Sequence, residues 1–206
     1  MRILKNHIYE SILLTARKEF LSAGFKDASM RAIAQGANVG LSNIYNYFRN
    51  KDDIFRAIVQ PALDDIYAYI DRQHSEENTD LERFSTIYYQ EEAVESYIRL
   101  IDCYREELYL LFFQSEGSSI KNFRETFTDY LTDVNISYQQ IVKKHYPASK
   151  EVSLFFMHTL SAWMVSILSE IIRHRISRRR MREFFREYFR FEFAGWQELI
   201  EVERKT

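Results

Sequence analysis

Five polar side chains between positions 42 and 47 suit hydrogen bonding to a second molecule: Ser42, Asn43, Tyr45, Asn46 and Tyr47. Serine and asparagine donate or accept at base edges and phosphates, and a tyrosine hydroxyl reaches a phosphate from a rigid ring. Ile44 and Phe48 are four residues apart, so on a helix they form an apolar back that packs inward. For Tyr45, core packing is an equal alternative because its ring is amphipathic.

Positive charge surrounds this polar stretch. Ser29 and Arg31 stand at the start of a short expected helix, and Lys51 opens a later one, where free backbone N–H groups favour an anion. Residues 1–51 carry eight Lys and Arg against three Asp and Glu, whereas the remainder carries 20 against 27. A basic head on an acidic body is expected if only the head meets phosphate. The alternative for Ser42, Asn43 and Lys51 is plain solvated surface.

Catalytic and metal-binding patterns are missing from the sequence. The single cysteine, Cys103, excludes an internal disulfide and a cysteine-based zinc cluster. The five histidines are dispersed, without a His-x-x-x-His pair, and no Gly-rich phosphate loop occurs. We therefore predict that the protein is not an enzyme and holds no cofactor or metal, and we interpret His158 as a core or pocket histidine.

The elements that must position the polar stretch read as a helix-turn-helix. Apolar spacing predicts helices over residues 3–23, 30–36 and 40–47. Ser29 is a good N-cap, and Gly24 and Asn38 suit the left-handed backbone at the ends of the first two helices. Two helices of about two turns each, joined by three or four residues, form the helix-turn-helix unit.

The rest of the chain also reads as helical. Asn50 caps a helix over residues 51–72, with Asp53 completing a capping-box-like pair. Pro61 predicts a kink in that helix, either a hinge or a static bend. Further helices are expected at about 81–105, 106–114, 119–145, 150–173 and 178–203. With only 5 Gly and 2 Pro, the prediction is an all-α fold of about nine helices, with domains at 1–50 and 51–206.

Two segments carry a family resemblance. Residues 29–39 (SMRAIAQGANV) and 44–52 (IYNYFRNKD) resemble the DNA-binding signature of the tetracycline-repressor (TetR) family, over roughly a quarter of the chain from Phe20 to Phe55. Asn38, Gly40 and Ser42 depart from the common pattern without removing the scaffold. The predicted DNA-binding set is Ser29, Met30, Arg31, Gly40, Leu41, Ser42, Asn43, Tyr45, Asn46, Tyr47 and Lys51.

The resemblance implies a sequence-specific DNA-binding transcriptional regulator, a repressor that a small-molecule effector releases from its operator. One alternative is a ligand-independent accessory or architectural factor of the same fold. A second alternative is a helical interaction protein that never touches DNA.

A dimer is expected because a helix-turn-helix monomer covers little DNA, so two half-sites of a near-palindromic operator are bound together. The resemblance implies that the last two helices form a four-helix bundle across a homodimer. The predicted interface comprises Ile167, Ile171, Phe184, Tyr188, Phe191, Gly195 and Leu199. The alternative is that these residues belong to the core of a single chain.

The abundance of aromatic residues suggests a ligand pocket between helices, although packed core is the commoner meaning of such a stripe. The predicted lining is Tyr88, Tyr89, Tyr104, Phe112, Phe127, Phe155, His158 and Trp163. The basic stretch over residues 173–190 is interpreted as a solvated helix face partnered by acidic residues, in preference to a second nucleic-acid patch.

The N-terminus is amphipathic and lacks the continuous apolar core of a signal peptide. We find no uninterrupted apolar stretch of the ~20 residues that cross a bilayer. The expected location is cytoplasmic, with no membrane partner.

Overall fold

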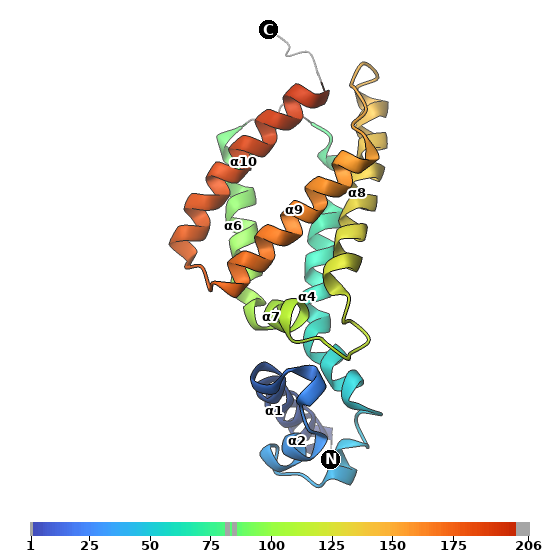
Figure 1. Ribbon diagram of the computed structural model, residues 1–206, viewed down its shortest axis with the longest axis vertical. Coiled ribbons are helices and arrows are strands. Elements are labelled where there is room, and N and C mark those ends of the chain that lie inside the picture. The colour runs from blue at the N-terminus through green and yellow to red at the C-terminus, as the bar shows by residue number, and fades with distance from the viewer. Residues whose placement is uncertain (1, 81–82, 84–85, 201–206) are drawn as a thin grey trace. The chain divides into compact units, whose positions relative to one another are not determined.

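A computed structural model describes residues 2–80, 83 and 86–200. Within these ranges all regular elements are helical, which confirms the predicted all-α fold of about nine helices (Figure 1). They are α1 (Arg2–Asp27), α2 (Met30–Gly36), α3 (Leu41–Ile44), α4 (Lys51–Gln73), a 3₁₀ turn η1 (Glu76–Asn78), α6 (Ile87–Cys103), α7 (Arg105–Phe113), α8 (Phe123–His145), α9 (Leu154–Arg173) and α10 (Arg178–Ile200). Two predicted boundaries lie outside the described residues: the start of one helix at residue 81 and the end of another at residue 203.

The chain divides into two compact units. The first comprises Met1–Asp64 and Tyr104–Phe123, and the second comprises Asp65–Cys103 and Arg124–Thr206. The chain therefore passes between the units three times, and α4 runs through the first of these passages as one helix that includes Pro61. The predicted functional domains divide the chain once, after residue 50, and that division stays a prediction, as does the kink at Pro61.

The first unit is built on α1, which contacts both α2 and α7, while α2 contacts α3. Gly24 has the predicted positive φ, 76°, although α1 continues past it to Asp27. The bend turns Phe25 back onto the preceding turn, where its ring stacks on Phe20 at 5.8 Å and meets Phe55 of α4 edge-on at 5.3 Å. These three rings, all buried, join the ends of α1 and α4 in one core.

Polar contacts hold α7 and the loop after it within the first unit. Arg17 of α1 forms an ion pair with Glu107, whose side chain is buried in α7. The carboxylate of Asp52 accepts hydrogen bonds from the backbone N–H of Ser119 at 2.8 Å and from its hydroxyl at 2.7 Å. Because Asp52 lies in the first turn of α4, it also offers negative charge to the positive end of that helix.

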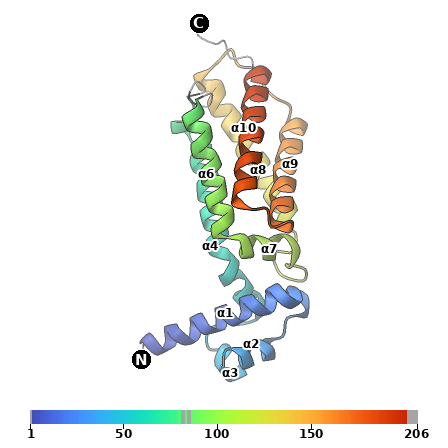
Figure 2. The ribbon, with the colours of Figure 1, turned by 90° about the vertical axis from the view of Figure 1, so that its left-hand side faces the viewer.

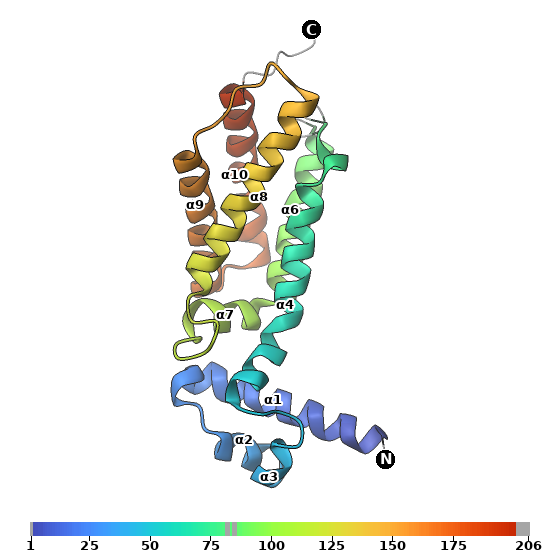
Figure 3. The same ribbon diagram turned by 90° about the vertical axis from the view of Figure 1, so that its right-hand side faces the viewer.

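In the described part of the second unit, the later part of α4 stands with α6, α8, α9 and α10 (Figures 2 and 3), and contacts between their side chains join them into a closed ring. Tyr69 of α4 packs edge-on against Tyr97 of α6, with ring centroids 5.6 Å apart. On the other side of α4, Tyr67 lies 4.5 Å from Tyr130 of α8. The ring continues where Asn135 of α8 donates to the hydroxyl of Ser161 in α9 at 3.3 Å.

The ring closes through α10. Trp163 of α9 lies 5.4 Å from the ring of Tyr188 in α10, and α10 packs along α6. Ion pairs follow this last contact: Arg186 binds both carboxylate oxygens of Glu91 at 2.7 and 2.8 Å, and Arg182 reaches Glu95 at 2.6 Å. The basic stretch is thus partnered by carboxylates of α6, in agreement with its interpretation as a solvated helix face.

The helix α9 differs from one expectation. By length and composition it is apolar enough to cross a membrane, whereas the sequence was expected to contain no such segment. Core helices of soluble proteins pass the same test, and 39% of this apolar window is buried inside the structure. The finding is weak evidence for a membrane span.

Candidate functional site

Local hydrogen bonds shape α2 and the turn after it. The hydroxyl of Ser29 accepts from the backbone N–H of Arg31 at 3.2 Å and of Ala32 at 3.4 Å, so Ser29 caps α2 as predicted. Asn38 takes the predicted left-handed conformation with φ of 54°, and Val39 N–H then donates to the carbonyl of Ala34 at 3.0 Å. The turn between the two short helices is therefore closed by the backbone itself.

The helix α3 is shorter than predicted. It begins after Gly40 and ends at Ile44, and a turn follows in which Tyr47 N–H donates to Ile44 O at 2.9 Å. Gly40 has no side chain to cap the first turn, so one stabilising contact is missing. Ile44 and Phe48 are both buried, and these two anchors fix the turn against α1 and α2 as the sequence predicts.

The outward side of α3 presents the predicted polar groups. Ser42 and Asn46 are exposed and Asn43 is half-buried, with the Asn46 amide donating to the Asn43 carbonyl oxygen at 3.2 Å. Tyr45 is 52% exposed, which rules out core packing for this ring within the chain. The paired amides hold one another in a fixed arrangement, leaving one N–H of Asn46 and the amide N–H groups of Asn43 for another molecule.

The remaining predicted DNA contacts flank this surface. Ser29, Arg31 and Gly40 are exposed, whereas Met30, Leu41 and Tyr47 are half-buried. The ring of Tyr47 lies 6.3 Å from that of Tyr9 in α1, so its position is braced from behind.

Lys51 makes contacts within the chain, and its predicted contact with phosphate stays a prediction. Its ammonium group donates to the carbonyls of Lys26 at 3.1 Å and Ala28 at 2.9 Å, and it lies 4.6 Å from the centre of the Phe25 ring. These contacts tie the start of α4 to the segment between α1 and α2. The sequence did not reveal these contacts because the partner carbonyls lie 23 and 25 residues earlier in the chain.

A cavity of about 230 Å³ lies within the second unit, and each helix of the ring contributes to its lining. Five of the lining residues are tyrosines, which we call the cavity tyrosines: Tyr69, Tyr89, Tyr97, Tyr138 and Tyr188. Phe189, Phe193 and Trp196 add three more aromatic side chains. The polar residues that line the cavity include His74, Asn135 and Glu192.

Of the predicted pocket residues, Tyr89 alone lines this cavity. Tyr88 and Phe155 are 77% and 80% exposed, and Trp163 is 41% exposed. Phe127 is buried against Tyr67 and Tyr130, so it belongs to packed core.

Tyr104 and Phe112 belong to the first unit, and His158 lies on a different hollow of the surface. These seven predicted residues therefore lie outside the lining of this cavity, because composition reveals aromatic content but not how each helix is rotated in the ring.

Sequence reasoning missed most of the lining that the structure brings together. Tyr188, Glu192 and Trp196 recur at intervals of four in α10, so they share one face of that helix. Tyr89, Ala93 and Tyr97 do the same in α6. A carboxylate within an otherwise aromatic stripe was the available signal for a site.

Electrostatics inside the cavity differ from those in water. Burial raises the pKa of the Glu192 carboxyl to about 7, and hydrogen bonds from the Tyr188 hydroxyl and the Trp196 indole only partly oppose this shift. Burial lowers the pKa of His74, although its Nδ1 lies 2.8 Å from the carbonyl of Ile70. The pKa of Tyr138 is raised by burial as well. The cavity thus disfavours charge on all three groups.

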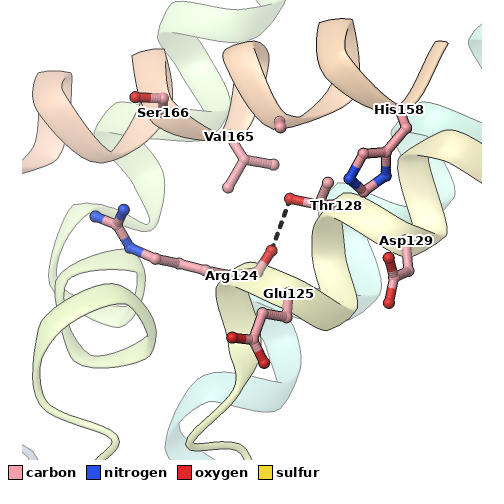
Figure 4. Close-up of a pocket in the computed structure, with 8 residues that line it drawn as sticks. Arg124, Glu125, Thr128, Asp129, His158, Val165 and Ser166 are labelled. Atoms are coloured by element: carbon pink, nitrogen blue, oxygen red, sulfur yellow. Dashed lines mark hydrogen bonds between the residues drawn. The ribbon is translucent and has the colours of Figure 1, made fainter. Parts of the chain in front are cut away.

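A shallower hollow of about 280 Å³ opens on the surface between α8 and α9. Figure 4 shows Thr128 and Val165 between the two helices, with Glu125 pointing away from α9. The hydroxyl of Thr128 donates to the carbonyl of Arg124 at 2.8 Å, so it is engaged within its own helix. In the described part of the chain, no cluster of three metal-ligating side chains occurs here or elsewhere.

The residues of the predicted dimer interface differ in how accessible they are, and the interface itself stays a prediction. Ile171 and Tyr188 are buried within the chain at 5% and 6% exposure, so they offer little surface to a partner, and Ile167 and Phe184 are half-buried. Phe191 and Leu199 are exposed, and a Cβ atom at Gly195 would meet open space.

Four large apolar residues of α9 are exposed as well, and we call the whole set the α9–α10 face: Leu154, Phe155, Phe156, Trp163, Phe191, Gly195 and Leu199. Trp163 and Phe191 connect its two halves, with ring centroids 6.0 Å apart.

Comparison with known proteins places the helix-turn-helix in a family. Residues 12–58 match the profile described as "Bacterial regulatory proteins, tetR family". The HTH-type transcriptional regulator YhgD of Bacillus subtilis (strain 168) is 40% identical over 52 residues, which are 25% of this chain and 27% of the relative. The matched region therefore spans about a quarter of that relative's length.

Similar solved structures cover nearly the whole chain. A transcriptional regulator of the TerR/AcrR family from Aquifex aeolicus VF5 has a TM-score of 0.60 at 18% identity, covering 89% of this chain and 98% of its own. A TetR-like transcriptional regulator from Rhodococcus sp. RHA1 has a TM-score of 0.61 at 16% identity, covering 91% and 96%. At such identities the likeness concerns the fold. The helix-turn-helix is thus similar to that of the tetR family of bacterial regulatory proteins, and the all-helical fold is similar to those of the two solved regulators.

Proposed function

We propose that this protein is a sequence-specific DNA-binding transcriptional regulator, a repressor that acts as a homodimer and leaves its operator when a small molecule occupies the cavity. The observation that carries the DNA-binding part is the outward side of α3. Ser42, Tyr45 and Asn46 stand exposed there, while Ile44 and Phe48 hold the helix from behind. Such a helix fits a major groove and reads base edges with its amides.

The α9–α10 face supports the homodimer. Large apolar side chains stand exposed on it, with Phe191 at 65% and Leu199 at 42%, and Gly195 between them allows a second helix to approach closely. Exposed apolar side chains that meet across two helices, as Trp163 and Phe191 do, favour a contact with another protein. A second copy in twofold symmetry would bring a second α3 to a second half-site.

The cavity supports release by an effector. Its lining draws on all five helices of the ring, including Tyr69 and Gln73 of α4. The same helix begins in the first unit at Lys51, and α6 leads through Tyr104 into α7, which packs on α1. Chain connectivity therefore gives a ligand two routes by which to bias the DNA-binding helices. A protein that binds DNA works where DNA is, so the proposed location is the cytoplasm.

The decisive experiment is selection of bound fragments from the source genome, followed by affinity measurement at several salt concentrations. We expect N43A/N46A to lower affinity for the selected fragment by tenfold or more, because paired amide contacts to bases are lost. Q140A, an exposed change in α8, should leave affinity unchanged. Failure of the unaltered protein to prefer any duplex at low salt would overturn the proposal.

The homodimer is tested by equilibrium sedimentation. We expect a species of twice the 24.8 kDa chain mass, and F191D/L199D should convert it to the monomer. I87D changes a still more exposed apolar residue on α6 and should leave the dimer intact. A single monomeric species from the unaltered protein would reject the dimer.

A further inference from the structure

We infer that the cavity of the second unit takes a small organic cation, whose charge is balanced by the Glu192 carboxylate and whose apolar groups lie against the surrounding aromatic rings. The inference rests on the proposed function only in treating the cavity as the effector site. Binding itself is a separate property and is tested separately.

The first argument is the charge of Glu192. The carboxyl lines the cavity, and the groups that act on it are its own burial and two neutral donors, the Tyr188 hydroxyl and the Trp196 indole N–H. Among the residues that the structure describes, no cationic side chain perturbs it. Glu192 is half-buried, and taking a carboxylate partly out of water without a counter-charge is unfavourable, so a bound cation would supply the missing positive charge.

The second argument is the set of rings around this carboxylate. Glu192 acts electrostatically on Tyr89, Tyr97 and Tyr188, which places three cavity tyrosines close to its charge. Trp196 donates to the carboxyl directly. Aromatic faces attract ammonium groups, and recognition of quaternary ammonium ions uses such cages of rings. A negative charge inside an aromatic enclosure favours a cation over a neutral or anionic guest.

The third argument is size. An engineered apolar cavity of roughly 150 Å³ accepts benzene. The present cavity of about 230 Å³ leaves room for one ring with a small ammonium group attached. Benzyltrimethylammonium is a suitable probe, and neopentylbenzene has the same shape with carbon in place of the charged nitrogen.

Other titratable groups in the cavity do not supply the same charge. They are the five cavity tyrosines, His74 and Lys150. Burial lowers the pKa of His74, so it is neutral near pH 7, and burial raises the pKa of Tyr69, Tyr97 and Tyr188. Lys150 is exposed and does not perturb Glu192. With a pKa of about 7, Glu192 is therefore the group whose charge changes between about pH 6 and 8.

The experiment is calorimetric titration of the full-length protein with benzyltrimethylammonium, neopentylbenzene and benzoate at pH 6 and pH 8. We expect the cation to bind most tightly, with affinity rising about tenfold between the two pH values as a carboxyl of pKa about 7 ionises. E192Q should reduce cation affinity at pH 8 by tenfold or more and remove the pH dependence. E187Q removes an exposed carboxylate from the same helix and should change neither.

Equal or tighter binding of neopentylbenzene or benzoate would overturn the inference, as would cation affinity that E192Q leaves unchanged or no cation binding at all. None of these results touches DNA binding, which the fragment selection measures. Conversely, a cation that binds through Glu192 without weakening the protein–DNA complex would uphold this inference and refute release by a ligand. The two proposals therefore fail in distinguishable ways.

Discussion

Gly36 of α2 lies so close to Thr15 of α1 that a Cβ atom at position 36 would stand 2.6 Å from the Thr15 methyl carbon. The glycine thus sets the distance between the helix that carries the turn and the helix that supports it. A methyl group there forces a shift of Thr15 or of the helices, since interiors have few voids.

We expect G36A to lower the free energy of unfolding by about 1 kcal/mol, because overpacking outweighs the better helix propensity of alanine. Urea denaturation measures the change. T15S removes the obstructing methyl, so T15S/G36A should be more stable than G36A. Equal stability of G36A and the unaltered protein would contradict the close packing of these helices.

The ion pair between Arg17 and Glu107 should matter more than a surface pair. Glu107 is 5% exposed, so R17M would leave a buried carboxylate without its partner, at a cost of about 3 kcal/mol. R17M/E107M should recover most of that loss. E106Q alters the exposed neighbour, whose distance to Arg17 is 3.7 Å, and should change stability by less than about 0.5 kcal/mol. Urea denaturation of the unaltered protein and of these three variants measures the changes in stability.

Lys51 should stabilise the first unit more than it contributes to DNA affinity. K51M removes two hydrogen bonds to carbonyls and the contact with Phe25, so we expect a loss of about 1–2 kcal/mol in unfolding free energy. The exposed Lys18 offers the control K18M, which should be neutral. Full stability of K51M combined with weakened DNA binding would restore the contact with phosphate predicted from sequence.

Arg31 and Asn43 should affect DNA binding in different ways. Arg31 is exposed at the start of α2, so R31Q should weaken binding to all duplexes alike and reduce the slope of log affinity against log salt by about 1. N43A should instead weaken the selected fragment more than a scrambled duplex and leave the slope unchanged. A sequence-dependent effect of R31Q would assign it to base contacts.

Stability should fall as Glu192 ionises. Its folded pKa, about 7, lies above the reference value of 4.5, so the folded state holds the proton more tightly. The stability gained from the protonated Glu192 carboxyl is fully present below pH 4.5 and is lost as pH rises through 7. E192Q removes the dependence and should exceed the unaltered protein by up to roughly 3 kcal/mol above pH 7. E187Q should show no such gain in urea denaturation at pH 5 and 8.

The parts of the fold that sequence predicted best depend on short-range contacts. Ser29 caps α2 through N–H groups two and three residues away, and Asn50 accepts from Asp53 N–H at 2.8 Å as expected of a helix start. Asn38 was predicted from its residue type alone, since asparagine tolerates the left-handed conformation that it adopts. These interactions lie within a few residues, where residue type and spacing determine them.

The cavity lining could not be predicted because adjacent residues of the same type can face either solvent or the cavity. Tyr88 is 77% exposed while Tyr89 lines the cavity, although the two are adjacent and chemically identical. Which of them faces inward depends on how α6 is rotated among four other helices, and a stripe of aromatic residues on each helix leaves that rotation undetermined. The same rotation decides the burial of Tyr188, a predicted interface residue whose ring contacts Trp163 within the chain.

The first unit is assembled from two separate stretches of chain, Met1–Asp64 and Tyr104–Phe123. An excised N-terminal fragment would lack α7 and expose the part of its core that Leu108 and Leu111 normally cover. Chimaeras that graft a foreign DNA-reading head onto this effector module must therefore exchange both stretches together, with the junctions placed inside α4 and on either side of α7.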